Sequence, residues 1–491
     1  MKKLALLLLS VLSAAQPLRA QHDLTLGLEQ TVALANDSSL EAFRARNMYL
    51  SSYWQYRSYR ANRLPSLTLN LIPVQYNRNI TRRYDSEQDI DVYRTQQSLF
   101  SYGDLTLKQN FDLTGGTFYL NTELSYMRAF GSNRYTQYNA SPLRVGYQQN
   151  LVGYNAFRWE RKIEPLKYER AKKEYLYNAE GVAEQATSYF FALALAQLEY
   201  DMAVEQQATA DTLYAIGQER YKIASIGRGD LLTLRLDKVN AANSLQTAVS
   251  ALKRAMSSLA TFLNMDKNTR IRVNLPGSMP NLTIPVDRAL TLARENNPLF
   301  LQTRQTVLEA EQRVDRTRKE SRFNASIDAS VGYNQVADRI SGAYKHPLQQ
   351  EMVALSVSIP LIDWGVSKGK YNMARNNLNV ARISARQQEI SLDEDVLMTV
   401  SDFNIQQAQV KSAEEALDLS VMAYDETRQR FIIGKTDINA LSLARNRQTA
   451  ARRNYIAALQ NYWQYYYKIR KLTLFDFASG FSLSQKFDFQ P

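Results

Sequence analysis

The chain of 491 residues contains no cysteine and only two histidines. The absence of cysteine excludes disulfides, thiolate metal sites, catalytic thiols and a lipidated N-terminal cysteine. His22 lies close to the N-terminus and His346 precedes Pro347, and neither has a partner at the spacing of a metal site or a catalytic triad. We therefore expect no catalytic residue, no cofactor and no metal, and an enzyme is the weakest of the functional hypotheses.

Long apolar stretches are also rare. The apolar segment Leu4–Ala15 follows Lys2 and Lys3 and precedes a small-residue cleavage pattern, LRA, that ends at Ala20. This pattern predicts a secretory signal peptide over residues 1–20, and its apolar part is shorter than the roughly 20 residues that a membrane span needs. We expect the mature protein to leave the cytoplasm without a transmembrane helix, so that any membrane it crosses is crossed by strands.

Acidic residues are fewer than basic ones, and the formal net charge is +12. Removing residues 1–20 would remove three basic residues and no acid, which leaves +9. Such a balance can indicate nucleic acid or an anionic membrane as a partner. Here the basic residues are interspersed with acids along helical stretches, and the signal peptide directs the chain away from DNA. We therefore expect solvated helices and no nucleic-acid partner.

The chain contains an internal sequence repeat. LTLGLEQTVALANDSSL (24–40) matches the region IPVDRALTLARENNPLF (284–300) when the two are aligned at an offset of 259 residues, so that Leu40 corresponds to Leu299. PLRVGYQQNLVGYNAFRW (142–159) matches MVALSVSIPLIDWGVSKG (352–369) at an offset of 210. Ordered matches at two offsets indicate an internal duplication.

The duplication predicts the domain organisation. We expect a first repeat over 21–273, a proline-rich linker over 274–285, a second repeat over 286–473 and a C-terminal tail over 474–491. Each repeat is predicted to run from a helix through strands into a long helical hairpin.

Apolar and polar residues alternate with period two at four places, which predicts strands. We expect two in the first repeat, about 66–74 and 142–151, and two in the second, about 326–334 and 353–361. The apolar face comprises Leu67, Leu69, Leu71, Leu143, Val145, Tyr147, Leu355, Val357, Ile359 and Leu361. Residues 93–127 are also strand-like but have no counterpart in the second repeat, and we do not place them.

The helical hairpins are predicted over 155–273 and 366–473. Lys370–Ile433 contains neither glycine nor proline and would be on the order of 95 Å long as a helix. Heptad spacing along these segments is typical of helices packed in a coiled coil or larger cylinder. Four strands are too few for a closed barrel, whose minimum is about eight, so several copies would have to combine their strands.

The duplicated plan resembles the TolC family of outer-membrane efflux proteins. The resemblance rests on LTLGLEQTVALANDSSLEA and RALTLARENNP at the start of the two repeats, on LPSLTLNL and LSVSIPLIDWG, and on RYKIASIGRGDLL with RFIIGKTDINALSLARNRQTAAR. It implies a mainly α fold with β: a homotrimer whose twelve-stranded outer-membrane barrel continues into a periplasmic α-helical barrel. It also implies export of small molecules, contact with outer-membrane lipid, a periplasmic adaptor as partner, and an inner-membrane pump of the RND or ABC type.

The resemblance also implies roles for the two hairpin turns. The family closes its periplasmic entrance there, and its gate acid corresponds to Asp230, beside Arg228. The family's gate tyrosine corresponds to Phe431 and its gate arginine to Thr436, so we add Lys435 and Asp437 as gate candidates. Adaptor docking is implied for Tyr221, Ile223, Ala224, Ser225, Phe431, Ile433 and Gly434.

Other interpretations remain open. Asp230 and Asp437 both lie where a helix begins, and Asp is a preferred N-cap residue. The same tube would serve type I secretion of a protein or peptide as well as efflux. A periplasmic coiled-coil structural protein or adhesin would explain the signal peptide and heptads but not the repeated strands, and a periplasmic adaptor would carry one hairpin rather than two.

Overall fold

The computed structural model describes residues 23–130, 134–277 and 279–486. The predicted signal peptide lies outside the described residues. The chain divides into two compact units, a helical unit (Met1–Tyr49, Lys172–Pro298 and Ser391–Pro491) and a sheet unit (Leu50–Ala171 and Leu299–Ile390).

No helix among the described residues is long and apolar enough to cross a lipid bilayer.

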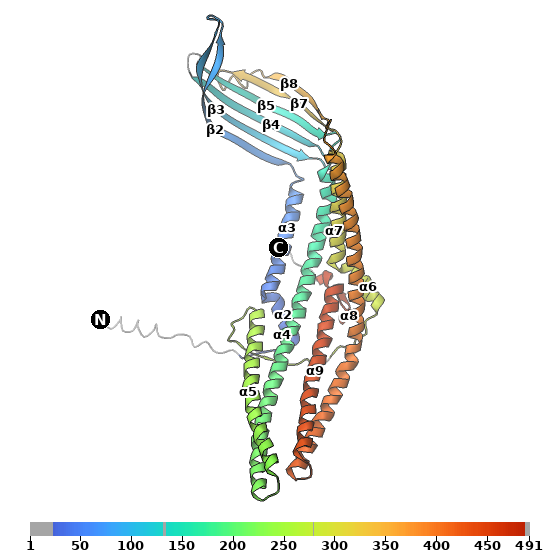
Figure 1. Cartoon of the computed structure of the whole chain (residues 1–491). Coiled ribbons are helices and arrows are strands. Elements are labelled where there is room, and N and C mark those ends of the chain that lie inside the picture. The colour runs from blue at the N-terminus through green and yellow to red at the C-terminus, as the bar shows by residue number, and fades with distance from the viewer. Residues whose placement is uncertain (1–22, 131–133, 278, 487–491) are drawn as a thin grey trace, which may run out of the picture. The chain divides into compact units, whose positions relative to one another are not determined.

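The sheet unit contains one antiparallel sheet of six strands. Figure 1 shows β2 at one edge of this sheet and β8 at the other, in the order β2-β3-β4-β5-β7-β8. Its strands are β2 (Ser66–Asp85), β3 (Ile90–Asn110), β4 (Thr117–Phe130), β5 (Tyr135–Asn150), β7 (Asn324–Ala337) and β8 (Leu348–Ser358).

The sheet differs from the prediction in strand number and strand length. The four predicted segments correspond to β2, β5, β7 and β8, while residues 93–127 form most of β3 and β4, so that the sheet has six strands instead of four. β8 ends at Ser358, two residues before Pro360, because proline has no N–H to donate to a strand ladder. Ile359 and Leu361 therefore lie outside the strand, contrary to the prediction.

The two faces of the sheet have opposite chemistry. Leucines project from one face and remain exposed; Leu67 retains 66% of its accessible surface and Leu355 63%. The other face is polar and crowded, and Asp104 is only 7% exposed. A sheet of a soluble protein buries its apolar face and exposes its polar face, so this sheet has the reverse arrangement.

The two long helical hairpins match each other in the length of their first helices. Their first helices, α4 (Ala156–Lys222) and α8 (Val366–Ile432), each have 67 residues. The returning helices are α5 (Arg228–Phe262) and α9 (Ile438–Thr473). The first returning helix ends earlier than predicted, because the chain then forms β6 (Arg270–Val273), which pairs in parallel with β1 (Asp23–Leu26).

Shorter helices precede the strands of each repeat, as the sequence predicts. They are α2 (Leu28–Ser38) and α3 (Leu40–Ala61) in the first repeat, and α6 (Val286–Asn296) and α7 (Pro298–Glu320) in the second. After α9 come the two-residue strands β9 (Phe475–Asp476) and β10 (Phe481–Ser482) and a short 3-10 helix, Leu483–Lys486.

The core of the helical unit is aromatic. Tyr462, Trp463, Tyr466 and Tyr467 on α9 are all buried, and Phe403 of α8 lies 5.1 Å from Tyr462 between ring centroids. The Tyr462 hydroxyl donates to the carbonyl oxygen of Pro280 at 2.8 Å, which fixes the linker against this core. Burial raises the pKa of Tyr462 to about 12, so the phenol stays neutral. Several of the 30 tyrosines of the chain thus lie in the interior of the helical unit.

A charged cluster lies next to this aromatic core. Arg470 of α9 makes a 2.9 Å ion pair with Glu180 of α4 and lies 3.7 Å from Asp476. The Tyr466 hydroxyl donates to the same Asp476 carboxylate at 2.7 Å. Burial raises the pKa of Asp476, but the Tyr466 hydrogen bond and the Arg470 charge lower it by more, and the net pKa lies below the ordinary value.

Candidate functional site at the hairpin tips

The two hairpin turns have the same backbone geometry. In the first turn Ala224 has φ +55° and the N–H of Ser225 donates to the Arg220 carbonyl at 2.8 Å. In the second turn Gly434 has φ +76° and the N–H of Lys435 donates to the Arg430 carbonyl at 2.8 Å. Both are left-handed helix C-caps of the Schellman type. The internal duplication therefore extends to the tips.

The tips differ in the residue that takes the left-handed conformation. Glycine adopts it without steric cost, whereas an L-residue places its Cβ close to a carbonyl oxygen. The second turn has Gly434 at this position, and the first has Ala224. The first tip is therefore the more strained of the two.

The two aspartates act at helix N-termini in different ways. Asp437 is the N-cap of α9, and its Oδ1 accepts from the Ala440 N–H at 2.7 Å, as the capping interpretation predicts. Asp230 is the third residue of α5 and not its N-cap. Its Oδ2 accepts from the N–H of the N-cap residue, Gly227, at 3.2 Å, which stabilises the start of the helix from within the first turn.

A buried apolar cluster joins the two hairpins just behind their turns. We call it the tip cluster; its buried members are Leu213 of α4, Leu234 of α5, Tyr424 and Phe431 of α8, and Leu441 of α9. Phe431 is only 8% exposed, which sets it apart from the other predicted docking residues. Burial raises the pKa of the Tyr424 phenol, so this residue is neutral in the cluster.

Arg220, which the sequence analysis did not single out, connects the tips. Its Nη2 donates to the carbonyl oxygen of Ile432 at 2.8 Å, and its guanidinium lies 5.7 Å from the centroid of the Phe431 ring. The contact crosses from the last turn of α4 to the last turn of α8. At the offset of 210 residues, Arg220 corresponds to Arg430, and this repeated arginine was the signal in the sequence.

The gate candidates proposed from the sequence do not form one cluster. Arg228, Asp230, Lys435 and Asp437 are all exposed, and among the described side chains none of the four hydrogen-bonds to another. Ile223 and Ile433, predicted to dock an adaptor, are 75% and 64% exposed at the two turns. Tyr221, Ala224, Ser225 and Gly434 are exposed as well.

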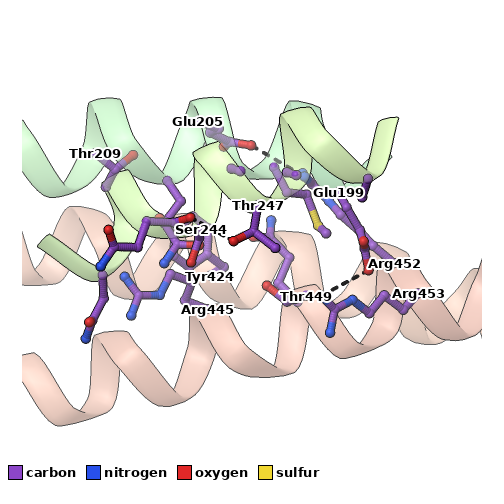
Figure 2. A pocket seen from close by; sticks show the side chains of 18 residues that line it. Glu199, Glu205, Thr209, Ser244, Thr247, Tyr424, Arg445, Thr449, Arg452 and Arg453 are labelled. Carbon is purple, nitrogen blue, oxygen red and sulfur yellow. Dashed lines mark hydrogen bonds and ion pairs between the residues drawn. The ribbon is translucent and has the colours of Figure 1, made fainter. Parts of the chain in front are cut away.

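Further from the turns, ion pairs join α9 to the first hairpin. Arg445 lies 3.8 Å from Asp237 of α5, and Arg452 and Arg453 lie 3.4 Å and 3.2 Å from Glu205 and Glu199 of α4. Arg445 and the two pairs made by Arg452 and Arg453 line a polar cavity of about 490 Å³ between the hairpins (Figure 2). Exposed and half-exposed ion pairs contribute little stability each, so these pairs add little to the free energy that holds the hairpins together.

The fold is similar to that of several outer-membrane channel proteins. The Campylobacter jejuni CmeC outer membrane channel superimposes with a TM-score of 0.66 at 14% identity, covering 94% of this chain and 88% of that one. The Vibrio cholerae outer membrane protein VceC gives 0.63 at 13%, covering 91% and 95%. The open state of the Neisseria gonorrhoeae MtrE outer membrane channel gives 0.60 at 15%, covering 91% and 88%.

The sequence itself matches one known family. Residues 289–473 match the outer membrane efflux protein family, and this range lies within the second repeat. No curated protein sequence matches the chain. The predicted resemblance to the TolC family is therefore confirmed, by sequence over residues 289–473 and by fold over most of the chain.

Proposed function

We propose that three copies of this chain form a channel through the outer membrane of a Gram-negative bacterium, with the helical hairpins in the periplasm. The channel would carry small molecules outward as the outer-membrane part of a tripartite efflux system. The chain would supply a conduit, while an inner-membrane pump supplies the energy.

The reversed faces of the six-stranded sheet carry this proposal. Exposed leucines on one face are suited to lipid, and the polar opposite face is suited to a water-filled lumen. In a periplasmic coiled-coil protein or an adhesin the same leucines would face water. Burial in lipid gains about 25 cal/mol for each Å² of apolar surface, which favours the membrane over solvent for this face.

The hairpin tips would form the periplasmic entrance. Arg220 and the tip cluster hold the two hairpins of a protomer together, and separating them would widen the passage. An adaptor would open the channel only if it binds the separated tips more tightly than the joined ones. The exposed Ile223 and Ile433 offer apolar contacts for such a partner at both turns.

Conductance of the purified protein in planar lipid bilayers tests the proposal. We expect discrete ion-conducting channels from the wild-type protein, with higher conductance once the tips are released by Arg220→Ala. The same protein inserted after heat denaturation is the control. Bilayers that stay silent with both the wild-type and the Arg220→Ala protein would overturn the channel function.

A further inference from the structure

The first repeat has one strand pair more than the second. Four strands, β2 to β5, separate α3 from α4, whereas only β7 and β8 separate α7 from α8. The additional pair changes the strand count that the TolC resemblance implies, which is four per chain and twelve in a trimer.

Side-chain hydrogen bonds integrate the additional pair into the polar face of the sheet. Asn70 of β2 donates to Asp104 of β3 at 3.1 Å, and Asn121 of β4 donates to the same carboxylate at 3.2 Å. The network continues to Arg144 of β5, which donates to Asn121 of β4 at 3.0 Å and makes an ion pair with Glu123 of β4 at 3.1 Å. A bonded polar network thus spans four neighbouring strands on this face.

The apolar face is equally continuous. In the register of the sheet, one row runs from β2 to β7 through directly paired positions: Leu67, Leu107, Leu120, Val145 and Val331. On β8 the residue paired with Val331 is Glu351, and the apolar band continues towards the end of the strand with Val353, Leu355 and Val357, all exposed. The extra strands therefore present the same lipid-compatible surface, at the same height in the sheet, as the strands that both repeats share.

The two edges of the sheet are complementary to each other. Every neighbouring pair from β2 to β8 is antiparallel, so β2 and β8, five steps apart, also run in opposite directions. In the described chain each pairs on one side only, and an unpaired edge is not tolerated in lipid. A second copy placed with its β2 beside β8 would continue the antiparallel order.

We propose that β2 of each copy pairs with β8 of the next, so that three copies of six strands close an eighteen-stranded barrel. This inference rests on the trimeric channel proposed above and adds the identity of the contact strands. Barrel diameter grows roughly linearly with strand number, so the barrel would be about one and a half times as wide as a twelve-stranded one. Barrels of this size enclose an aqueous channel.

Cysteine cross-linking tests the contact, because the chain has no cysteine of its own. A first panel places one cysteine on β2 (Leu67→Cys, Leu69→Cys or Leu71→Cys) and one on β8 (Val353→Cys, Leu355→Cys or Val357→Cys). The matched control panel combines the same β8 positions with β4 (Leu120→Cys, Thr122→Cys or Leu124→Cys). Within one chain β4 and β8 are three strand spacings, about 14 Å, apart, so neither panel can form the bond internally.

The readout is the shift from single chains to reducible multimers on denaturing gels, after oxidation in the outer membrane. The native mass of the uncross-linked protein is measured alongside. We expect a native trimer and reducible dimers and trimers from the β2–β8 panel, with single chains only from the β4–β8 panel.

Each alternative outcome is decisive. A native trimer that cross-links between β4 and β8 but not between β2 and β8 would show that β2 and β3 lie outside the barrel and that β4 is its edge strand; this overturns the eighteen-stranded barrel and leaves the channel function intact. A native mass other than that of three chains would overturn both proposals.

Discussion

Arg220 bridges the tips of the two hairpins. Among the described residues near the turns, its side chain is the one that makes a hydrogen bond from the first hairpin to the second. Arg220→Ala removes a charge-assisted hydrogen bond to the Ile432 carbonyl, and we expect this to shift the closed-to-open ratio by about 1 kcal/mol per protomer. That corresponds to about a five-fold change, since 1.4 kcal/mol is a factor of ten. Single-channel recording in planar bilayers should show a higher mean conductance.

Arg228→Ala is the matched control for Arg220→Ala. It removes the same charge from the same turn, but in the described structure Arg228 makes no hydrogen bond to the second hairpin. If the hydrogen bond of Arg220 to the second hairpin holds the tips together, the conductance of the Arg228→Ala channel should be nearly unchanged. If Arg228→Ala opened the channel and Arg220→Ala did not, the charge around the first turn and not the bridge would control the entrance.

The left-handed residues at the two tips predict opposite effects of exchanging glycine and alanine. Ala224→Gly relieves the Cβ contact and should stabilise the first turn by about 1 kcal/mol, and Gly434→Ala should destabilise the second by a similar amount. Hydrogen exchange of the amides in each turn measures these changes locally. Faster exchange at the first turn in Ala224→Gly would contradict the strain assigned to Ala224.

At the scale of an element, α9 depends on its N-cap. Asp437→Ala removes the acceptor for the Ala440 N–H and should destabilise the start of the helix by about 1 kcal/mol. Asp437→Asn keeps an acceptor and removes only the charge. Hydrogen exchange along the first turn of α9 should therefore rise in the alanine variant alone, and equal increases in both variants would favour the charge over the cap.

Asp476, which follows the end of α9, should make the stability of the protein depend on pH. The pKa of Asp476 in the folded protein lies below the ordinary value of about 3.9. The ionised carboxylate therefore contributes to the free energy of unfolding at pH values above about 3.9, and this contribution is lost as the pH falls through the lowered pKa. Asp476→Asn should destabilise the protein at pH 6 and have less effect at pH 3, measured by thermal unfolding.

Tyr466→Phe separates the causes of this pH dependence. It removes the hydrogen bond from the phenol to Asp476 and keeps the carboxylate and Arg470, so the loss of stability should begin at a higher pH than in the wild type. A wild-type protein whose stability does not differ from that of Asp476→Asn at any pH would contradict the assigned role of Asp476.

The sequence predicts elements whose pattern is local. The helices of the second hairpin follow from heptads and from the lack of glycine and proline over Lys370–Ile433, and the turns follow from the duplicated motifs. The number of strands in the sheet did not follow, since residues 93–127 have no counterpart in the second repeat and their pairing partners are set by the sheet. The end of β8 was missed because the alternation continues to Leu361 although Pro360 cannot join a ladder.

The tip site was only partly predictable. The positions of both turns and the capping role of Asp437 follow from local sequence. The bridge made by Arg220 depends on how closely α4 and α8 approach, and burial of Phe431 depends on four helices meeting. Such contacts arise from tertiary packing, which no single motif encodes.

At the scale of the whole molecule, each part of the duplicated chain has its own proposed role. The sheet with reversed faces would form the membrane barrel, the long hairpins would form the periplasmic conduit, and the tips would control entry. All three roles require several copies, because one sheet of six strands has two open edges and one pair of hairpins cannot enclose a passage.

The most direct test of the central claim is the native mass of the protein extracted in mild detergent from outer-membrane fractions, measured by native mass spectrometry. We expect a complex of three chains in that fraction. A folded, stable single chain would contradict the composite channel, and recovery from the soluble periplasmic fraction would contradict the membrane sheet.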